Sequence, residues 1–188
     1  MGQEFELKFA AGRETLARIR ARYGPGEAVS METTYYDTPD GLLSRQGITL
    51  RRRLENGVPI CTVKTPARDG VRGEWECAAD DLSEAIPRLL GLGAPPVLGE
   101  LTEVRPICAA RFTRIVCPLP GAELALDQGV LTGGGREEPF GEVEVEQKSG
   151  SREQTTRLAR EIAREFSLLP QPKSKFRRAL ALARQADV

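Results

Sequence analysis

Histidine is absent from all 188 residues of this chain. Its absence excludes acid–base catalysis by imidazole, nucleophile pairs of the Ser-His or Cys-His type, and histidine ligation of a metal. Any chemistry must therefore depend on carboxylates, amines, guanidinium groups, hydroxyls or a hard metal ion.

Cysteine is scarce, and the chain has no C-x-x-C pair. The four cysteines are Cys61, Cys77, Cys108 and Cys117. Two of them fall on the apolar phase of predicted strands, so we interpret the cysteines as small core residues.

The sequence also lacks a long apolar run and a net charge. No apolar run approaches the length of a transmembrane helix, and the N-terminus is acidic where a secretory signal would be basic. Lysine plus arginine and aspartate plus glutamate both total 27, so no global charge excess attracts nucleic acid or anionic lipid. We therefore predict a cytoplasmic protein with no nucleic-acid or membrane partner. Its oligomeric state is left open.

The length and composition favour a single domain over residues 1–188. The chain is 40% apolar and 29% charged, and 188 residues suffice for one sizeable core but are few for two. Alternating patterns and turn residues predict eight strands and three to four helices, an α+β fold with an antiparallel sheet that could close into a barrel or tunnel.

The strand pattern gives one N-terminal strand, two single strands, two hairpins and a last strand. The hairpins turn at Arg68-Asp69-Gly70 and Pro120-Gly121, and Gly133 to Glu138 is predicted to be a flexible loop tip. The strands are expected within residues 2–10, 30–38, 47–57, 58–79, 109–131 and 140–148. The helices are expected at 11–24, at about 82–90 where Pro87 starts or interrupts the helix, from the cap Ser151 to about 166, and at 172–186.

Charged residues gather on one face of several predicted strands. The first strand places Glu4, Glu6 and Lys8 on one face, opposite three apolar side chains. Like charges at such positions repel, and an ordinary solvated face usually interleaves signs with Thr, Ser and Gln. The other faces of this kind carry Arg51 and Arg53; Lys64; Arg72, Glu74 and Glu76; and Glu142, Glu144 and Glu146.

Two interpretations of these faces are open. The first is a sheet with helices on one side and water on the other. In the second, the carboxylates bind Mg²⁺ or Mn²⁺, which prefer hard oxygen ligands, and the arginines and lysines bind a phosphate chain. Both sets on one closed interior would form a site for metal and polyphosphate.

Eight short motifs occur in the order of one known family. They are Glu4-x-Glu6-x-Lys8, TYYDT, LRRR, TVK, RGEWE, LALDQG, EVEVE and the late SK before the last helix. Over essentially its whole length the chain resembles the CYTH family, the triphosphate tunnel metalloenzymes. The resemblance implies an eight-stranded antiparallel β tunnel, a closed barrel decorated by helices, that binds a triphosphate together with Mg²⁺ or Mn²⁺.

The resemblance also implies roles for individual residues. The metal ligands would be Glu4, Glu6, Glu144 and Glu146, with Glu142 a less secure match. The substrate-binding residues would be Lys8, Arg51, Arg53, Lys64, Arg114 and Lys175, with Arg72 and Arg111 as further candidates. Glu74 and Glu76 are expected to pair with tunnel cations, and Asp127 to pair with a lysine.

Glu4, Glu6, Lys8, Tyr35 and Lys64 form the predicted catalytic set. In the branch that resembles thiamine triphosphatase, Tyr35 paired with Lys64 is a proposed base, because a nearby ammonium lowers the pKa of a phenol. A water activated by the metal is the alternative base.

The leading function is metal-dependent hydrolysis of inorganic triphosphate, with nucleoside triphosphates as further substrates. LALDQG and EVEVE are most similar to the bacterial triphosphatases. Some of those carry a C-terminal helical CHAD domain, and we expect none in this sequence, which ends at Val188. The alternatives are a thiamine triphosphatase, a class IV-type adenylyl cyclase, and a non-catalytic module that binds triphosphate or polyphosphate. The presence of all four metal carboxylates favours an enzyme.

Overall fold

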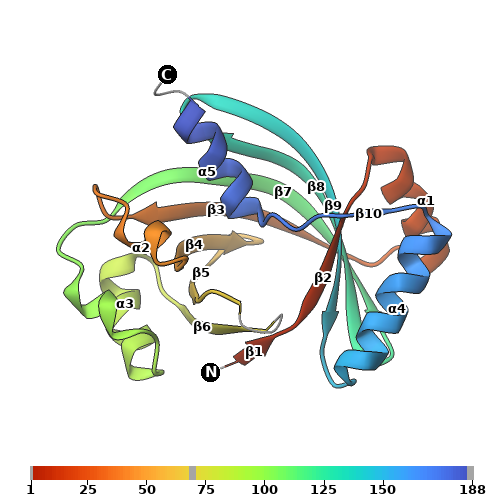
Figure 1. The fold of residues 1–188 in the computed structure, drawn as a ribbon, viewed down its shortest axis with the longest axis horizontal. Coiled ribbons are helices and arrows are strands. Elements are labelled where there is room, and N and C mark those ends of the chain that lie inside the picture. Colours follow the sequence, from red (N-terminus) through yellow and green to blue (C-terminus); the bar gives the residue numbers. More distant parts are fainter. Residues whose placement is uncertain (1, 68–70, 186–188) are drawn as a thin grey trace.

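The computed structural model describes residues 2–67 and 71–185, and its strands form one strongly curved sheet (Figure 1). The strands are β1 (Gly2–Glu4), β2 (Glu6–Ala10), β3 (Glu27–Asp37), β4 (Thr49–Glu55), β5 (Val58–Lys64), β6 (Arg72–Ala78), β7 (Arg105–Leu119), β8 (Ala122–Gly133), β9 (Arg136–Gln147) and β10 (Leu169–Pro170). The helices are α1 (Arg13–Tyr23), α2 (Leu42–Arg45), α3 (Leu82–Gly91), the 3₁₀ helix η1 (Pro96–Glu100), α4 (Arg152–Glu165) and α5 (Lys175–Gln185).

All neighbouring strands pair antiparallel, in the order β1-β6-β5-β4-β3-β7-β8-β9-β2-β10. The segments β1 and β2 are two parts of one N-terminal stretch separated at Phe5. Residues 2–4 pair with β6 and residues 6–10 pair with β9, so this stretch connects the two ends of the order. With β1 and β2 taken as one strand and the two-residue β10 left aside, the described residues contain the eight predicted strands.

The predicted closed barrel is wrong in one detail. The hydrogen-bonded order is linear, because no single strand pairs along its whole length with both β6 and β9. The prediction of an α+β fold with an antiparallel sheet is confirmed.

Three helices cover the outer face of the sheet (Figure 1), and apolar side chains pack beneath them. Helices α1 and α4 cover β2, β8 and β9, where Ile19 and Ile162 pack with Phe9 and Val143. Helix α3 covers β5 and β6, and its Leu89 belongs to a second cluster. Burial of these apolar residues removes their surface from water and fixes which face of each strand turns outward.

Helix α5 packs on the opposite, inner face. Its Phe176, Ala179 and Leu182 contact buried residues of β3, β7, β8 and β9, including Tyr35 and Leu131. Ring centroids of Tyr35 and Phe176 lie 5.2 Å apart. The last helix therefore covers one end of the inner face, and its first residues point toward the charged strands.

Local sequence signals explain several element ends. Ser151 caps α4 in a reciprocal capping box with Gln154, and Gly24 ends α1 with φ 105°, a conformation that favours glycine. Helix α3 continues through Pro87, which the sequence analysis left open. The short helix α2 was missed; the Asp37 carboxylate accepts hydrogen bonds from the N–H groups of Leu43 and Ser44 in its first turn.

Two predicted turns differ in outcome. The predicted flexible tip at Gly133 to Glu138 is wrong, because β8 and β9 are joined only by Gly134 and Gly135, whose positive φ angles of 58° and 73° make a tight turn. The predicted turn at Arg68-Asp69-Gly70 lies outside the described residues.

The cysteine prediction is confirmed for three of the four residues. Cys61, Cys108 and Cys117 are buried, Cys77 is partly buried, and all four are free thiols. Within residues 2–67 and 71–185, no helix combines the length and apolar character that a membrane crossing requires.

Candidate functional site

The inner face of the sheet encloses a charged cavity of about 330 Å³. This volume lies at the lower end of the range typical of small-ligand sites. The cavity brings together twelve of the predicted site residues: Glu4, Glu6, Lys8, Tyr35, Arg51, Arg53, Lys64, Arg72, Arg114, Glu144, Glu146 and Lys175. Strands from both ends of the chain contribute to it.

Strand alternation explains why these charges point inward. On β4, Arg51 and Arg53 line the cavity and only 11% of each side chain is exposed. The side chain of Arg52 points the other way and donates through Nε to the carbonyl of Asp80 at 2.6 Å. The interpretation of a sheet face in open water is therefore wrong.

Carboxylates hold the cations of one wall in place. Lys64 Nζ donates to both Glu4 oxygens at 2.6 and 2.7 Å, and lies 3.2 Å from Glu74. Arg51 Nη2 lies 3.6 Å from the same Glu74. The predicted pairing of Glu74 with cations of the tunnel is therefore confirmed. Arg51 Nε is buried without a hydrogen-bond partner in the part of the chain that the structure describes.

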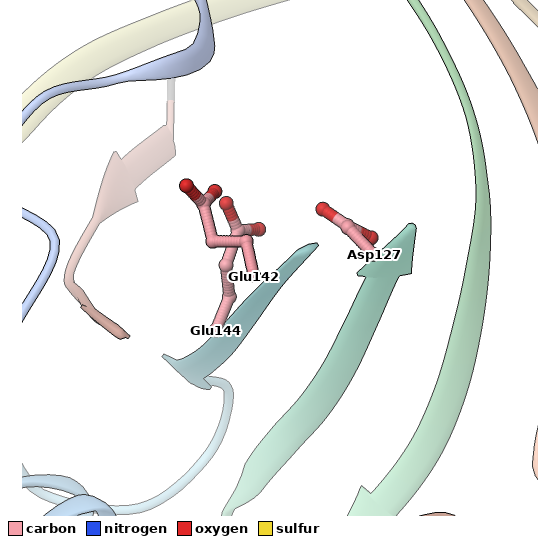
Figure 2. A group of neighbouring side chains, drawn as sticks. All are labelled: Asp127, Glu142 and Glu144. Carbon is pink, nitrogen blue, oxygen red and sulfur yellow. The ribbon is translucent and has the colours of Figure 1, made fainter. Parts of the chain in front are cut away.

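Behind the opposite wall, Asp127 of β8 lies beside Glu142 and Glu144 of β9 (Figure 2). One oxygen from each lies within 4.8 Å of the others. Lys175 Nζ contacts all three, at 2.7 Å for Asp127 and 2.8 Å for Glu144. The predicted pairing of Asp127 with a lysine is confirmed.

Two arginines complete this ion-pair cluster. Arg114 makes two hydrogen bonds of 2.8 Å to Asp127 and also contacts Glu144. Arg178 Nη1 donates to Glu142 at 2.9 Å. Three cations thus balance three carboxylates, which is how proteins stabilise buried charge. Glu142 is fully buried and does not line the cavity.

The pKa values of Glu142 and Glu144 are shifted in opposite directions. Burial raises the pKa of Glu142 to about 7, and the neighbouring Glu144 adds to the rise although Lys175 opposes it. Burial also acts to raise the pKa of Glu144, but Lys175 and Arg114 hold it well below its usual range. Glu144 therefore stays ionised at neutral pH.

The raised pKa of Glu142 predicts a loss of stability between about pH 5 and pH 8. The folded state holds this proton more tightly than the unfolded chain, so the stabilisation is complete below about 4.5 and is lost as pH rises through about 7. The expected loss is on the order of 1–3 kcal/mol, measured by urea unfolding in EDTA at each pH. Glu142→Gln should flatten the profile, and an equally steep profile in that variant would contradict this assignment.

A row of carboxylates crosses three neighbouring strands at the exposed edge of the cavity. Glu146 of β9 lies opposite Glu6 of β2 on one side and Glu123 of β8 on the other. Burial raises the pKa of Glu146, as do the nearby carboxylates Glu4 and Glu123, while Lys148 opposes the rise. The row carries a surplus of negative charge.

The sequence analysis missed Glu123 and Lys148. Both line the cavity. Both could have been found by extending the two-residue alternation, because Glu123 lies on the same strand face as Asp127, and Lys148 follows Glu146 by two positions. They lie at the ends of their strands, where the pattern was not followed.

The donor set fits a hard divalent cation. Glu4, Glu6, Glu144 and Glu146 line one cavity from β1, β2 and β9, and their oxygens are the ligands that Mg²⁺ and Mn²⁺ prefer. The surplus negative charge around Glu146 is the electrostatic condition that a cation relieves. The cluster of Asp127, Glu142 and Glu144 fits less well, because Asp127 and Glu142 are fully buried in ion pairs and do not line the cavity.

The predicted lowering of the Tyr35 pKa by Lys64 is wrong. Burial raises the pKa of Tyr35, although the charges of Arg51 and Arg53 act to lower it. Lys64 pairs with Glu4 instead and is not among the charges that act on the phenol. Tyr35 therefore lines the cavity as a protonated phenol.

Arg111 is not part of the cavity. Its position on β7 alternates with that of Arg114, so its side chain is on the outer face, 69% exposed and 3.9 Å from Glu137. The suggestion that Arg111 contacts phosphate is wrong.

A curved antiparallel sheet around a cavity lined by carboxylates, arginines and lysines has the architecture of a β-tunnel protein. The CYTH domain family matches residues 2–180, and the chain belongs to that family. This confirms the resemblance found in the sequence.

A curated relative supports the same assignment. The inorganic triphosphatase of Haemophilus influenzae is 30% identical over 165 residues, which cover 80% of this chain and 47% of that protein. The chain thus spans about half the length of this relative.

Solved structures share the fold. A Pyrococcus horikoshii protein, PH1819, has a TM-score of 0.68 at 21% identity over 95% of this chain and 98% of its own. A Hippeastrum adenylyl cyclase candidate described as having a dominant triphosphatase activity gives 0.68 at 19% identity, covering 98% and 96%. A Bacillus halodurans adenylate cyclase candidate gives 0.67 at 22% identity, covering 93% and 96%. At these identities the similarity establishes the fold.

Proposed function

We propose that this protein is a metal-dependent triphosphatase whose preferred substrate is inorganic triphosphate. One observation carries the proposal: a single cavity of about 330 Å³ presents eight cationic and eight carboxylate side chains, grouped by strand. A triphosphate needs the cations for its oxygens, and its divalent counter-ion needs the carboxylates. The similarity to the Haemophilus influenzae triphosphatase supports the same reaction.

The cationic residues would bind and orient the phosphates. Arg51, Arg53 and Lys64 come from neighbouring strands β4 and β5, while Arg114 and Lys175 approach from β7 and α5. Their positions are fixed before substrate arrives, because carboxylates or hydroxyls already contact them. Such preorganised charge stabilises the negative charge that develops during phosphoryl transfer.

The carboxylates Glu4, Glu6, Glu144 and Glu146 would hold Mg²⁺ or Mn²⁺. When bound, such an ion neutralises phosphoryl oxygens and lowers the electrostatic barrier to attack. Lys64 contacts Glu4, Lys8 contacts Glu6 at 3.1 Å, and Lys175 contacts Glu144. Each of these three predicted metal ligands is therefore adjacent to a cation that lines the same cavity.

The cavity favours inorganic triphosphate over substrates with an organic group. Among the described residues that line it, the aromatic side chains are Tyr35 and Phe176, and they pack against each other beside α5. Neither presents a free ring face at the exposed edge, where a nucleobase or thiazole would stack.

The test is phosphate release from inorganic triphosphate, ATP, thiamine triphosphate and pyrophosphate with Mg²⁺, Mn²⁺ or EDTA, with cyclic AMP assayed in the ATP reactions. Metal-dependent release that is greatest from inorganic triphosphate is expected. Cyclic AMP as the main product would show a cyclase. No product from any substrate, with binding still measurable by calorimetry, would show a binding module and overturn the proposal.

Arg53→Ala should weaken the binding of inorganic triphosphate. Arg53 is almost fully buried, and its Nε and Nη1 donate to Thr33 at 3.3 Å and to Glu55 at 3.0 Å. Loss of one buried contact to a charged group costs about 1.5–3 kcal/mol of binding, which calorimetry measures. Arg52→Ala is the matched control, because its side chain lies on the outer face. Equal affinities of both variants and wild type would exclude Arg53 from the binding site.

A further inference from the structure

Lys148 differs from the other cations that line the cavity. Its side chain is 45% exposed, whereas the other seven are between 9% and 26% exposed. It directly follows β9, and its backbone N–H donates to the carbonyl of Gly121 at 3.0 Å. The backbone of Lys148 is thus anchored, while its side chain lies at the edge of the cavity with room to move.

The ammonium of Lys148 lies between two carboxylates. Nζ is 2.9 Å from Glu146 and 3.7 Å from Glu123, which face each other across β8 and β9. Like charges directly opposite on neighbouring strands repel, and Glu6 lies on the other side of Glu146. Lys8 contacts Glu6 at 3.1 Å, so Lys148 is the cation in contact with the remaining two carboxylates of the row.

A divalent ion at Glu146 would compete with the ammonium of Lys148 for this carboxylate. A divalent ion bound by Glu146 and the ammonium of Lys148 would occupy the same negative field, because the lysine already neutralises this carboxylate. The exposed side chain can leave at little cost, since exposed ion pairs contribute little to stability. Once displaced, its charge remains at the edge of the cavity, where a polyanion approaches.

We propose that Lys148 is a positioning residue that competes with the divalent cation for Glu146 and whose charge favours the binding of triphosphate. This inference rests on the proposed function. If it is correct, Lys148 weakens the binding of the divalent cation and strengthens the binding of the anion. A residue with only a structural role would change both in the same direction, because damage to the site weakens each ligand.

The test measures two bindings by calorimetry on the full chain: Mn²⁺ alone, and inorganic triphosphate in EDTA. Lys148→Met should bind Mn²⁺ about fivefold more tightly and triphosphate about fivefold more weakly than wild type. Lys148→Arg keeps the charge and should resemble wild type. Lys173→Met removes an exposed lysine outside the cavity and should change neither binding.

Opposite shifts in Lys148→Met alone would support the inference. Weaker binding of both ligands would show that Lys148 only maintains the structure, and unchanged binding would show an ordinary surface ion pair; either overturns it. Wild-type protein that binds no Mn²⁺ and hydrolyses no triphosphate would instead defeat the proposed function, and this inference with it.

Discussion

Glu6→Gln should lower metal-dependent phosphate release from inorganic triphosphate by about a hundredfold or more while the protein remains folded. The Glu6 carboxylate lines the cavity, lies opposite Glu146 in the sheet, and is 15% exposed. Glutamine keeps the shape of the side chain but removes the charge that a divalent ion requires of this ligand. Mutation of groups that merely support a ligand already costs about 10- to 100-fold. The measurement is the turnover rate at saturating Mg²⁺ or Mn²⁺.

Glu137→Gln is the matched control for this prediction. Glu137 is a carboxylate of β9 whose side chain is 59% exposed beside Arg111, away from the cavity. It should retain wild-type turnover, and urea unfolding of both variants should show comparable stability. Wild-type turnover of Glu6→Gln at every metal concentration would remove Glu6 from the metal-binding set.

Lys175→Met should lower the free energy of unfolding by about 3–5 kcal/mol. The ammonium of Lys175 is buried and contacts the three carboxylates that Figure 2 draws, so its removal leaves them without their shared partner. Methionine has nearly the length of lysine, so the loss of stability measures the removal of the charge and not the creation of a cavity. The measurement is urea unfolding at pH 7 in EDTA.

Two further variants distinguish charge from packing. Lys173→Met removes an exposed lysine just before α5 and should change stability by less than about 0.5 kcal/mol. Lys175→Met combined with Glu142→Gln removes one of the uncompensated carboxyl groups and should recover part of the loss. A loss below about 1 kcal/mol in Lys175→Met would mean that Arg114 and Arg178 suffice to balance the cluster.

Much of the cavity could be predicted because strand alternation is a local property. Arg51, Arg53 and Glu144 occupy positions of a fixed two-residue period, and apolar neighbours on the other phase fix which face turns to the core. The same rule, applied along β7, excludes Arg111, because Arg111 lies on the phase opposite to Arg114. Strand alternation was insufficient where tertiary context was needed: the pKa of Tyr35 depends on burial under α5, which the strand pattern does not contain.

The sequence by itself determined the class of fold, the order of the strands along the chain, the inward phase of the charged residues and the family. Only the tertiary structure decided which charges meet. Lys175 and Glu142 are separated by 33 positions in the sequence and Lys64 and Glu4 by 60, yet each pair is in contact. These long-range contacts decide which carboxylates are buried in ion pairs and which line the cavity. Asp127 and Glu142 are buried in ion pairs, while Glu6 and Glu146 remain at the cavity, because the electrostatic energy of a charge is set by its neighbours in space.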